Sequence, residues 1–275
     1  MQELVSSTFN LRSDLHIGDI AWQRFQQEIA DQDWPTYLLE VDRKLVSWGW
    51  LDPTNHLMLA VHPSHPEATG PLIEKLSKSS SKSTMTVDIF ESEEHIISRL
   101  LSNGFCEMND GLFYLRMAVD LRNLTDVSLP DGFSTRFIDT SADLEKRVDV
   151  HREAFHPSKV TYRSYGNAIN ATGYNSRLDC VAVSPDGTFA SFSLIWYDRN
   201  SGIGLLEPVG TSPRFRKLGL SKAVCTMALV ELKKMGGKYA IVNTWGDQGH
   251  PITAKLYNSM GFRAISRTRN FIKES

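Results

Sequence analysis

The chain has 275 residues, enough for about two domains of ordinary size, and its 41% apolar and 23% charged residues argue against a mainly disordered protein. Its 30 basic and 32 acidic residues leave a net charge of −2, which argues against a nucleic-acid-binding or polybasic membrane-binding surface. No apolar run reaches the roughly 18 residues of a membrane helix, and three widely spaced cysteines favour a reduced, cytoplasmic location over a disulfide scaffold.

The first half alternates between strand-like and amphipathic stretches with turn residues between them. Asn103-Gly104 ends a short helix whose first turn is acidic, as the helix dipole favours. Residues 105–119 are predicted to form a terminal hairpin that turns at 109–111. The other predicted elements are strands over 36–42, 44–50, 56–61 and 84–90 and helices over 66–76 and 92–101.

The second half repeats this order of elements. Gly104-Phe105 and Gly261-Phe262 each follow a short predicted helix. A repeat of domain length indicates a duplication, and the polar, turn-rich stretch 120–132 is expected to join the copies. The predicted elements are strands over 178–183, 188–198, 203–211 and 238–244, helices over about 217–235 and 252–260, and one or two strands over 262–274.

The stretch 207–221 carries the clearest chemical signal. A predicted strand ends near Val209 and a long helix follows, and the start of a helix offers unpaired N–H groups that bind phosphate oxygens. Arg214, Arg216 and Lys217 add positive charge there, and Gly219 lets the backbone approach a ligand. An ordinary strand–loop–helix with a basic start explains the same pattern, so phosphate binding is one of two interpretations.

A metal site is not expected. His151, Glu153 and His156 lack the HExxH spacing of a zinc site. His62 and His65 lie in a Pro-rich turn, where solvated loop histidines are the simpler interpretation because zinc needs three or four converging ligands.

Two segments of the second half resemble the GCN5-related N-acetyltransferase (GNAT) superfamily. EPVGTSPRFRKLGLSKA resembles the Q/R-x-x-G-x-G/A acetyl-CoA segment of that family, and LYNSMGF follows at the matching distance. The first half resembles a degenerate copy, so the whole chain resembles the tandem GNAT proteins, of which mycothiol synthase is one type. This implies an α/β (α+β) fold with two tandem GNAT-like domains, each a mixed, mostly antiparallel sheet flanked by helices. The expected domains are a degenerate one over 1–125 and an acetyl-CoA-binding catalytic one over 131–275.

The resemblance implies roles for individual residues, with acetyl-CoA as the co-substrate. Val209 and Thr211 would pair with the pantetheine arm, with the Val209 N–H directed to the thioester oxygen. Tyr257 would protonate the departing CoA thiolate, and Glu207 would act as general base, directly or through water, or merely order the site. A tyrosine at this place on a short helix is often only a packing residue. The expected cofactor-binding residues are Val209, Gly210, Thr211, Arg214, Arg216, Lys217, Leu218, Gly219, Leu220, Ser221 and His250.

The chain departs from the family pattern at several positions. Ser221 replaces the usual Gly or Ala, and His250 stands where the family often has Asn. In the first half, Pro71 lacks a backbone donor where phosphate would need one, and Leu100 stands in the place of Tyr257. We therefore expect the first half to bind CoA poorly or not at all, and to close one side of the acceptor cleft.

The activity that the resemblance implies is transfer of an acetyl group to a primary amine of a small molecule by direct attack in a ternary complex. A non-catalytic acyl-CoA-binding or regulatory module, and an acyltransferase with a different acyl group or acceptor, stay open. The oligomeric state cannot be read from the sequence. The expected acceptor lining is polar and aromatic, and consists of His151, Glu153, Phe155, His156, Tyr162, Tyr165 and Tyr174.

Overall fold

The computed structural model describes residues 1–26, 28, 34–80, 82–108, 112–124, 127–246 and 251–274. Within these ranges it contains eight α-helices and twelve strands. The helices are α1 (Gln2–Thr8), α2 (Ile17–Phe25), α3 (Thr69–Lys78), α4 (Glu94–Ser102), α5 (Leu144–Ala154), α6 (Tyr162–Ile169), α7 (Leu220–Lys234) and α8 (Pro251–Ser259). The strands are β1 (Thr36–Val41), β2 (Lys44–Leu51), β3 (Leu57–Val61), β4 (Thr84–Phe90), β5 (Cys106–Glu107), β6 (Tyr114–Asp120), β7 (Ser134–Phe137), β8 (Asp179–Val183), β9 (Phe189–Asp198), β10 (Ile203–Thr211), β11 (Tyr239–Trp245) and β12 (Arg263–Glu274).

Two sheets organise the molecule, as the α/β (α+β) prediction requires. Strands β1, β2 and β3 form an antiparallel sheet, and the other strands form a nine-stranded sheet in the order β4-β12-β6-β11-β10-β9-β8-β7, with β5 paired to β12. Pairing in the large sheet is antiparallel except between β10 and β11. The mixed, mostly antiparallel sheets flanked by helices are confirmed.

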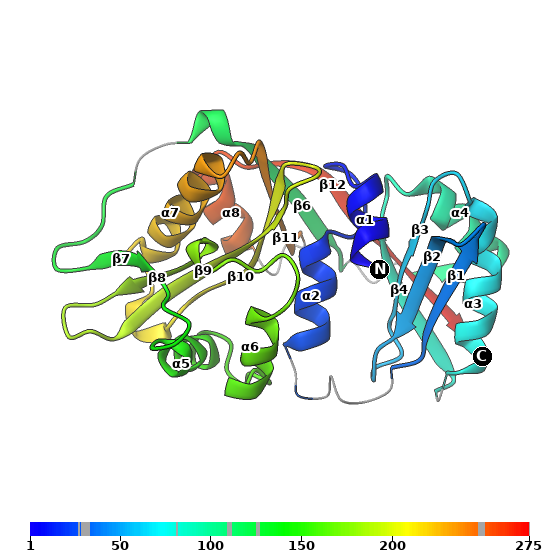
Figure 1. The fold of residues 1–275 in the computed structure, drawn as a ribbon, viewed down its shortest axis with the longest axis horizontal. Helices are drawn as coiled ribbons and strands as arrows, with labels where there is room; N and C mark the ends of the chain where they lie inside the picture. Colours follow the sequence, from blue (N-terminus) through cyan, green and yellow to red (C-terminus); the bar gives the residue numbers. More distant parts are fainter. Residues whose placement is uncertain are drawn as a thin grey trace.

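The two halves exchange strands, as Figure 1 shows. Strand β6 comes from the first half but lies between β11 and β12. Strand β12 runs from the second half into the first, where its end pairs with β4 and β5. The predicted terminal hairpin over 105–119 is therefore wrong, because β5 and β6 pair with other strands. Strand β6 suits a central place since Met117 and Val119 are buried on one face and Arg116 on the other.

The duplication is visible in local geometry. Gly104 and Gly261 both have left-handed φ values, of 85° and 91°. The N–H of Phe105 donates to the carbonyl of Leu100 and that of Phe262 to the carbonyl of Tyr257, each at 3.1 Å. The two helices α4 and α8 thus end in the same way, and Leu100 occupies the place of Tyr257.

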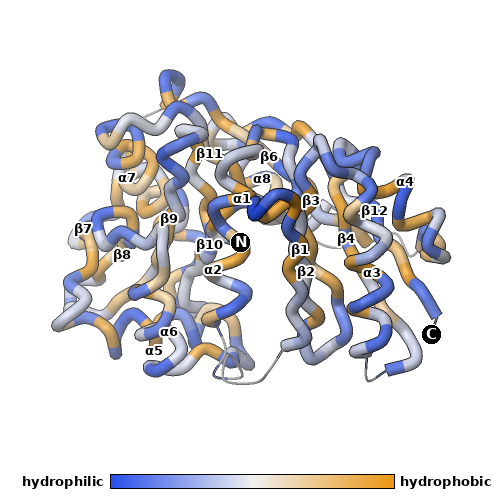
Figure 2. Tube along the Cα trace, turned by 45° about the vertical axis from the view of Figure 1, so that its right-hand side comes forward, coloured by the Kyte–Doolittle hydropathy of each residue, from blue (hydrophilic) through white to orange (hydrophobic). Residues whose placement is uncertain are grey.

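Two helices that the sequence pattern did not predict, α1 and α2, pack between the halves. Their apolar residues, among them Trp22, share one core cluster with Trp48 and Trp50 of β2 and with Trp196 of β9. Figure 2 shows hydrophobic segments concentrated along the inner strands of both halves. None of the described helices is long and apolar enough to cross a membrane.

Candidate functional site

Strands β10 and β11 separate in the middle of the large sheet. They pair in parallel only from Ile203 to Leu205, against residues 239–241. Beyond that point β10 stays paired with β9, through a bulge between Leu206 and Val209. The edge of β10 from Val209 to Thr211 therefore faces the gap that opens between the strands.

The bulge presents Glu207 to a cleft. The carbonyl oxygen of Glu207 accepts a hydrogen bond from Nε1 of the buried Trp196 at 2.8 Å, which fixes the backbone there. Its carboxylate lines the cleft. Burial, together with a smaller effect of the nearby charge of Asp19, raises the pKa of Glu207 to about 8. A carboxylate with this pKa can accept a proton near neutral pH.

Tyr257 lies on α8 and lines the same cleft. The side chain is 6% exposed, with its ring edge-on to Phe262 at 5.6 Å. No described residue forms a hydrogen bond with its hydroxyl. Burial raises the Tyr257 pKa well above its ordinary value, with further contributions from Cys225 and Glu207, so the hydroxyl stays protonated at neutral pH.

The cleft has a volume of about 590 Å³ and lies between the two halves. The second half contributes the bulge of β10, the end of β11 and Tyr257. The first half contributes α2, the β2–β3 turn, β4 and Tyr114 of β6. Half of the cleft wall thus comes from the copy that lacks the tyrosine.

The start of α7 leaves its backbone N–H groups uncapped beside basic residues. Gly219 precedes the helix with φ 79°, and no side chain caps the first N–H groups. A Cβ on Gly219 would meet open space, so its φ, not crowding, favours glycine there. Arg214, Arg216 and Lys217 are exposed in the loop before the helix. The helix begins at Leu220 instead of near Lys217, because Lys217 also has a left-handed φ, of 65°.

A chain of hydroxyls ties the end of β10 to α7. Ser191 Oγ bonds Thr211 Oγ1 at 2.8 Å, which in turn bonds Ser221 Oγ at 2.6 Å. Gly210 packs tightly, since an added Cβ would lie 2.6 Å from Phe192 and 2.9 Å from Ala154. Ser221 in place of the usual Gly or Ala is thus a link between the strand and the helix.

The predicted site residues fall in three places. Glu207, Val209 and Tyr257 all line the cleft. Gly210, Thr211 and the loop before α7 continue from its edge, with Leu218 exposed and Leu220 buried in the core. His250 lies outside the described residues.

Several solved structures share this architecture. No protein-family model and no curated protein matches the chain. A tandem GNAT protein from the clavulanic acid biosynthesis pathway aligns with a TM-score of 0.69 at 16% identity, covering 99% of this chain and 92% of that one. A GNAT-family acetyltransferase from Colwellia psychrerythraea gives 0.66 at 15% identity over 99% and 95% of the chains. A GCN5-related N-acetyltransferase from Sphaerobacter thermophilus gives 0.65 at 17% over 95% and 86%.

The chain has the tandem GNAT fold. The similarity is spread over both halves, which confirms the tandem resemblance seen in the sequence. The narrower likeness to mycothiol synthase and the division at 125/131 stay predictions.

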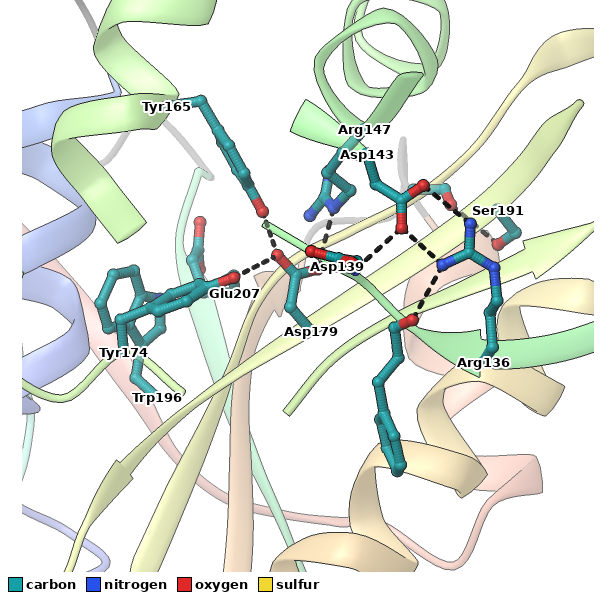
Figure 3. Close-up of polar contacts among 12 residues, drawn as sticks. Arg136, Asp139, Asp143, Arg147, Tyr165, Tyr174, Asp179, Ser191, Trp196 and Glu207 are labelled. Atoms are coloured by element: carbon teal, nitrogen blue, oxygen red, sulfur yellow. Dashed lines mark hydrogen bonds and ion pairs between the residues drawn. The ribbon is translucent and has the colours of Figure 1, made fainter. Parts of the chain in front are cut away.

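Most of the expected acceptor-lining residues have other roles in this GNAT fold. Figure 3 shows Tyr165 and Tyr174 directed at Asp179, which also accepts a hydrogen bond from Arg147 Nε at 2.9 Å. This buried network fastens α5 and α6 to β8, so its tyrosines are structural. Of the expected set, Phe155 alone is among the described residues that line the cleft.

Two other residues of the expected acceptor lining, His151 and Glu153, also make contacts inside the fold. His151 stacks on Phe192 at 5.4 Å, and burial lowers its pKa to about 3, helped by the charge of Arg147. Glu153 accepts a hydrogen bond from Ser212 Oγ at 2.6 Å. These contacts position the α5 end beside β10.

The sequence pattern missed the carboxylates of the first half that line the cleft. Asp14 and Asp19 flank the start of α2, and Asp52 and Asp88 come from the β2–β3 turn and β4. In β4 Asp88 lies on the face opposite the core residue Val87. That face becomes a cleft wall only because the second half lies across from it. Among the described residues no group of three or more side chains that could hold a metal ion is found.

Proposed function

We propose that this protein transfers an acetyl group from acetyl-CoA to a primary amine of a small molecule, by direct attack in a ternary complex. The observation that carries the proposal is the meeting of Glu207 and Tyr257 in one cleft, at the point where β10 and β11 separate. The GNAT fold supports acyl transfer as the reaction class.

The residues present suit a CoA thioester. The free edge of Val209, Gly210 and Thr211 offers backbone groups to an extended pantetheine arm. The uncapped N–H groups at the start of α7 and the exposed Arg214 and Arg216 suit a diphosphate. In the first half, Pro71 lies in the first turn of α3 and has no backbone N–H, and the fully buried Leu100 stands in the place of Tyr257. The first half therefore lacks both the backbone donors and the hydroxyl that the second half offers.

Groups on β10 and on α8 share the steps of the proposed reaction. Acetyl-CoA supplies the thioester whose acetyl carbon bonds to the amine nitrogen while its carbon–sulfur bond breaks. Glu207 accepts the proton that the amine nitrogen loses, directly or through water. The N–H of Val209 donates to the thioester oxygen as negative charge develops on it. Tyr257 gives its proton to the departing sulfur.

We propose that the transferring unit is the second domain, within 131–275, and that the first, within 1–125, closes the acceptor side. The two domains have different roles in the proposed reaction but do not fold separately, because β6 of the first domain lies between β11 and β12 of the second. We propose a cytoplasmic location, which the reduced cysteines fit: Cys106, Cys180 and Cys225 are all free.

Calorimetric titration with acetyl-CoA tests the co-substrate. Replacing Arg214, Arg216 and Lys217 by Ala together raises the Kd for acetyl-CoA by roughly tenfold. The matched control replaces Lys233 and Lys234 by Ala at the opposite end of α7, where the Kd stays unchanged. No binding of acetyl-CoA at millimolar concentration overturns the proposal.

A further inference from the structure

The cleft has a polar wall that the first half provides. On β4, Val87 packs into the core of the first half, so strand alternation turns Thr86 and Asp88 to the cleft. Asp52 lines the same wall from the β2–β3 turn, where its carboxylate accepts hydrogen bonds that fix the turn. Glu207 lies on the wall of the second half. Carboxylates therefore stand on both sides of one cavity.

The described lining of the cleft is acidic. It includes no lysine or arginine. Arg116, fully buried behind the lining, donates to the backbone carbonyls of Ser13 and Asp14, and its charge lowers the pKa of Asp14 and Asp19 against the larger effect of their burial. The net effect raises the pKa of both groups, to about 7 for Asp14, which favours their neutral forms. The carboxylates of the lining are Asp14, Asp19, Asp52, Asp88 and Glu207.

Aromatic rings line the space between these carboxylates. Tyr114 stacks on Trp245 with ring centroids 4.5 Å apart, and both line the cleft. Burial, with smaller contributions from the charges of Asp88 and Glu207, raises the pKa of Tyr114 to about 12, so Tyr114 lies within electrostatic reach of both walls. Aromatic faces attract organic ammonium groups and pack against methylene chains.

An independent feature marks the cleft as a place for a ligand. Tyr257 is more than nine-tenths buried, lines the cleft, and has no hydrogen-bond partner for its hydroxyl in the described part of the chain. The hydroxyl is therefore available to form a hydrogen bond with a molecule bound in the cleft.

We infer that the acceptor is a linear diamine or polyamine, with one amino group at Glu207 and a further ammonium group against Asp52 and Asp88. The inference rests on the proposed acetyl transfer and adds the class of amine. An alkyl chain between two amino groups would cross the ring of Tyr114. A monoamine brings no second ammonium group to the far wall, and an amine that carries a carboxylate is repelled by it.

Three acceptors of similar length test the charge requirement: putrescine with two amino groups, butylamine with one, and γ-aminobutyrate with a carboxylate at its far end. We expect kcat/KM to be highest for putrescine, at least about tenfold above butylamine, and lowest for γ-aminobutyrate. Calorimetric binding of the same three amines in the presence of CoA gives the same order without requiring turnover.

Variants of the first half test the wall itself. Asp88→Asn reduces the advantage of putrescine over butylamine about tenfold, and Asp52→Asn reduces it in the same direction while keeping an oxygen that can accept the turn hydrogen bonds. Asp88→Glu keeps the negative charge and retains more of the putrescine advantage than Asp88→Asn does. Glu74→Gln, on an exposed helix of the same half, is the matched control and leaves the preference unchanged.

The outcomes separate the two proposals. Equal kcat/KM and equal binding for putrescine and butylamine overturn the diamine inference, while acetyl transfer stands. Absence of transfer to every amine, with acetyl-CoA bound, contradicts the proposed activity, and the binding order of the amines then still supports or overturns the acidic wall. A preference for putrescine that survives Asp88→Asn and Asp52→Asn together also overturns the inference.

Discussion

At the scale of single residues, the cleft shifts the pKa values of Glu207 and Tyr257 upward, and the proposed reaction uses both groups for proton transfer. A raised pKa makes the carboxylate of Glu207 a stronger base and keeps the hydroxyl of Tyr257 protonated. A carboxylate whose pKa is about 8 is a stronger base than an ordinary carboxylate, and it becomes deprotonated as pH rises through that value. A tyrosine whose pKa lies well above its ordinary value stays protonated at neutral pH, so its proton is still present when the thiolate leaves.

Glu207 predicts the pH dependence of the reaction. Because the carboxylate must be deprotonated to accept a proton, kcat/KM rises as pH rises through about 8. Glu207→Gln removes this rise and lowers kcat/KM by roughly 100-fold. The titration of the amine substrate itself remains in the variant and serves as the internal control. An unchanged profile in Glu207→Gln assigns the base elsewhere.

At the scale of elements, the fit between β10 and its neighbours sets the shape of the site. The sequence predicted β10, the start of a long helix after it, and the short helix that carries Tyr257, because each has a local signal in apolar period or stop residues. It did not predict that Gly210 packs against the side chains of Phe192 and Ala154, since β9 and α5 come together there only in the folded chain.

Gly210→Ala tests this packing. The new Cβ would lie 2.6 Å from Cζ of Phe192, so we expect a loss of about 1–3 kcal/mol in the free energy of unfolding. Gly166→Ala in α6 is the matched control: its Cβ meets nothing within 4 Å, and helix propensity predicts a gain of about 0.5–1 kcal/mol. Urea unfolding measures both, and equal stability of the two variants contradicts the packing argument.

At the scale of the whole molecule, the strand exchange joins the halves into one folding unit. The order of elements and the duplication could be predicted from the sequence, because both rest on local patterns and on Gly104 and Gly261. The exchange of β6 and the end of β12 could not, because strand partners far apart in the chain leave no local signal. The acceptor wall formed by Asp52 and Asp88 escaped prediction for the same reason.

The exchange predicts a single unfolding transition. Since β6 and β12 are each paired across both halves, neither half can unfold while the other keeps its complete sheet. Tryptophan fluorescence and far-UV circular dichroism should give coincident urea transitions. Two resolved transitions would mean that the halves fold independently.

In the proposed reaction, the cleft that holds Glu207 and Tyr257 transfers an acetyl group to an amine. The most direct measurement is mass spectrometry of a broad amine panel incubated with acetyl-CoA, with the wild type beside Tyr257→Phe. We predict an amine whose mass increases by one acetyl group, and roughly 100-fold slower transfer in Tyr257→Phe with acetyl-CoA binding unchanged. Tight binding of CoA with no acetylated product from any amine would contradict the claim and favour a non-catalytic acyl-CoA-binding module.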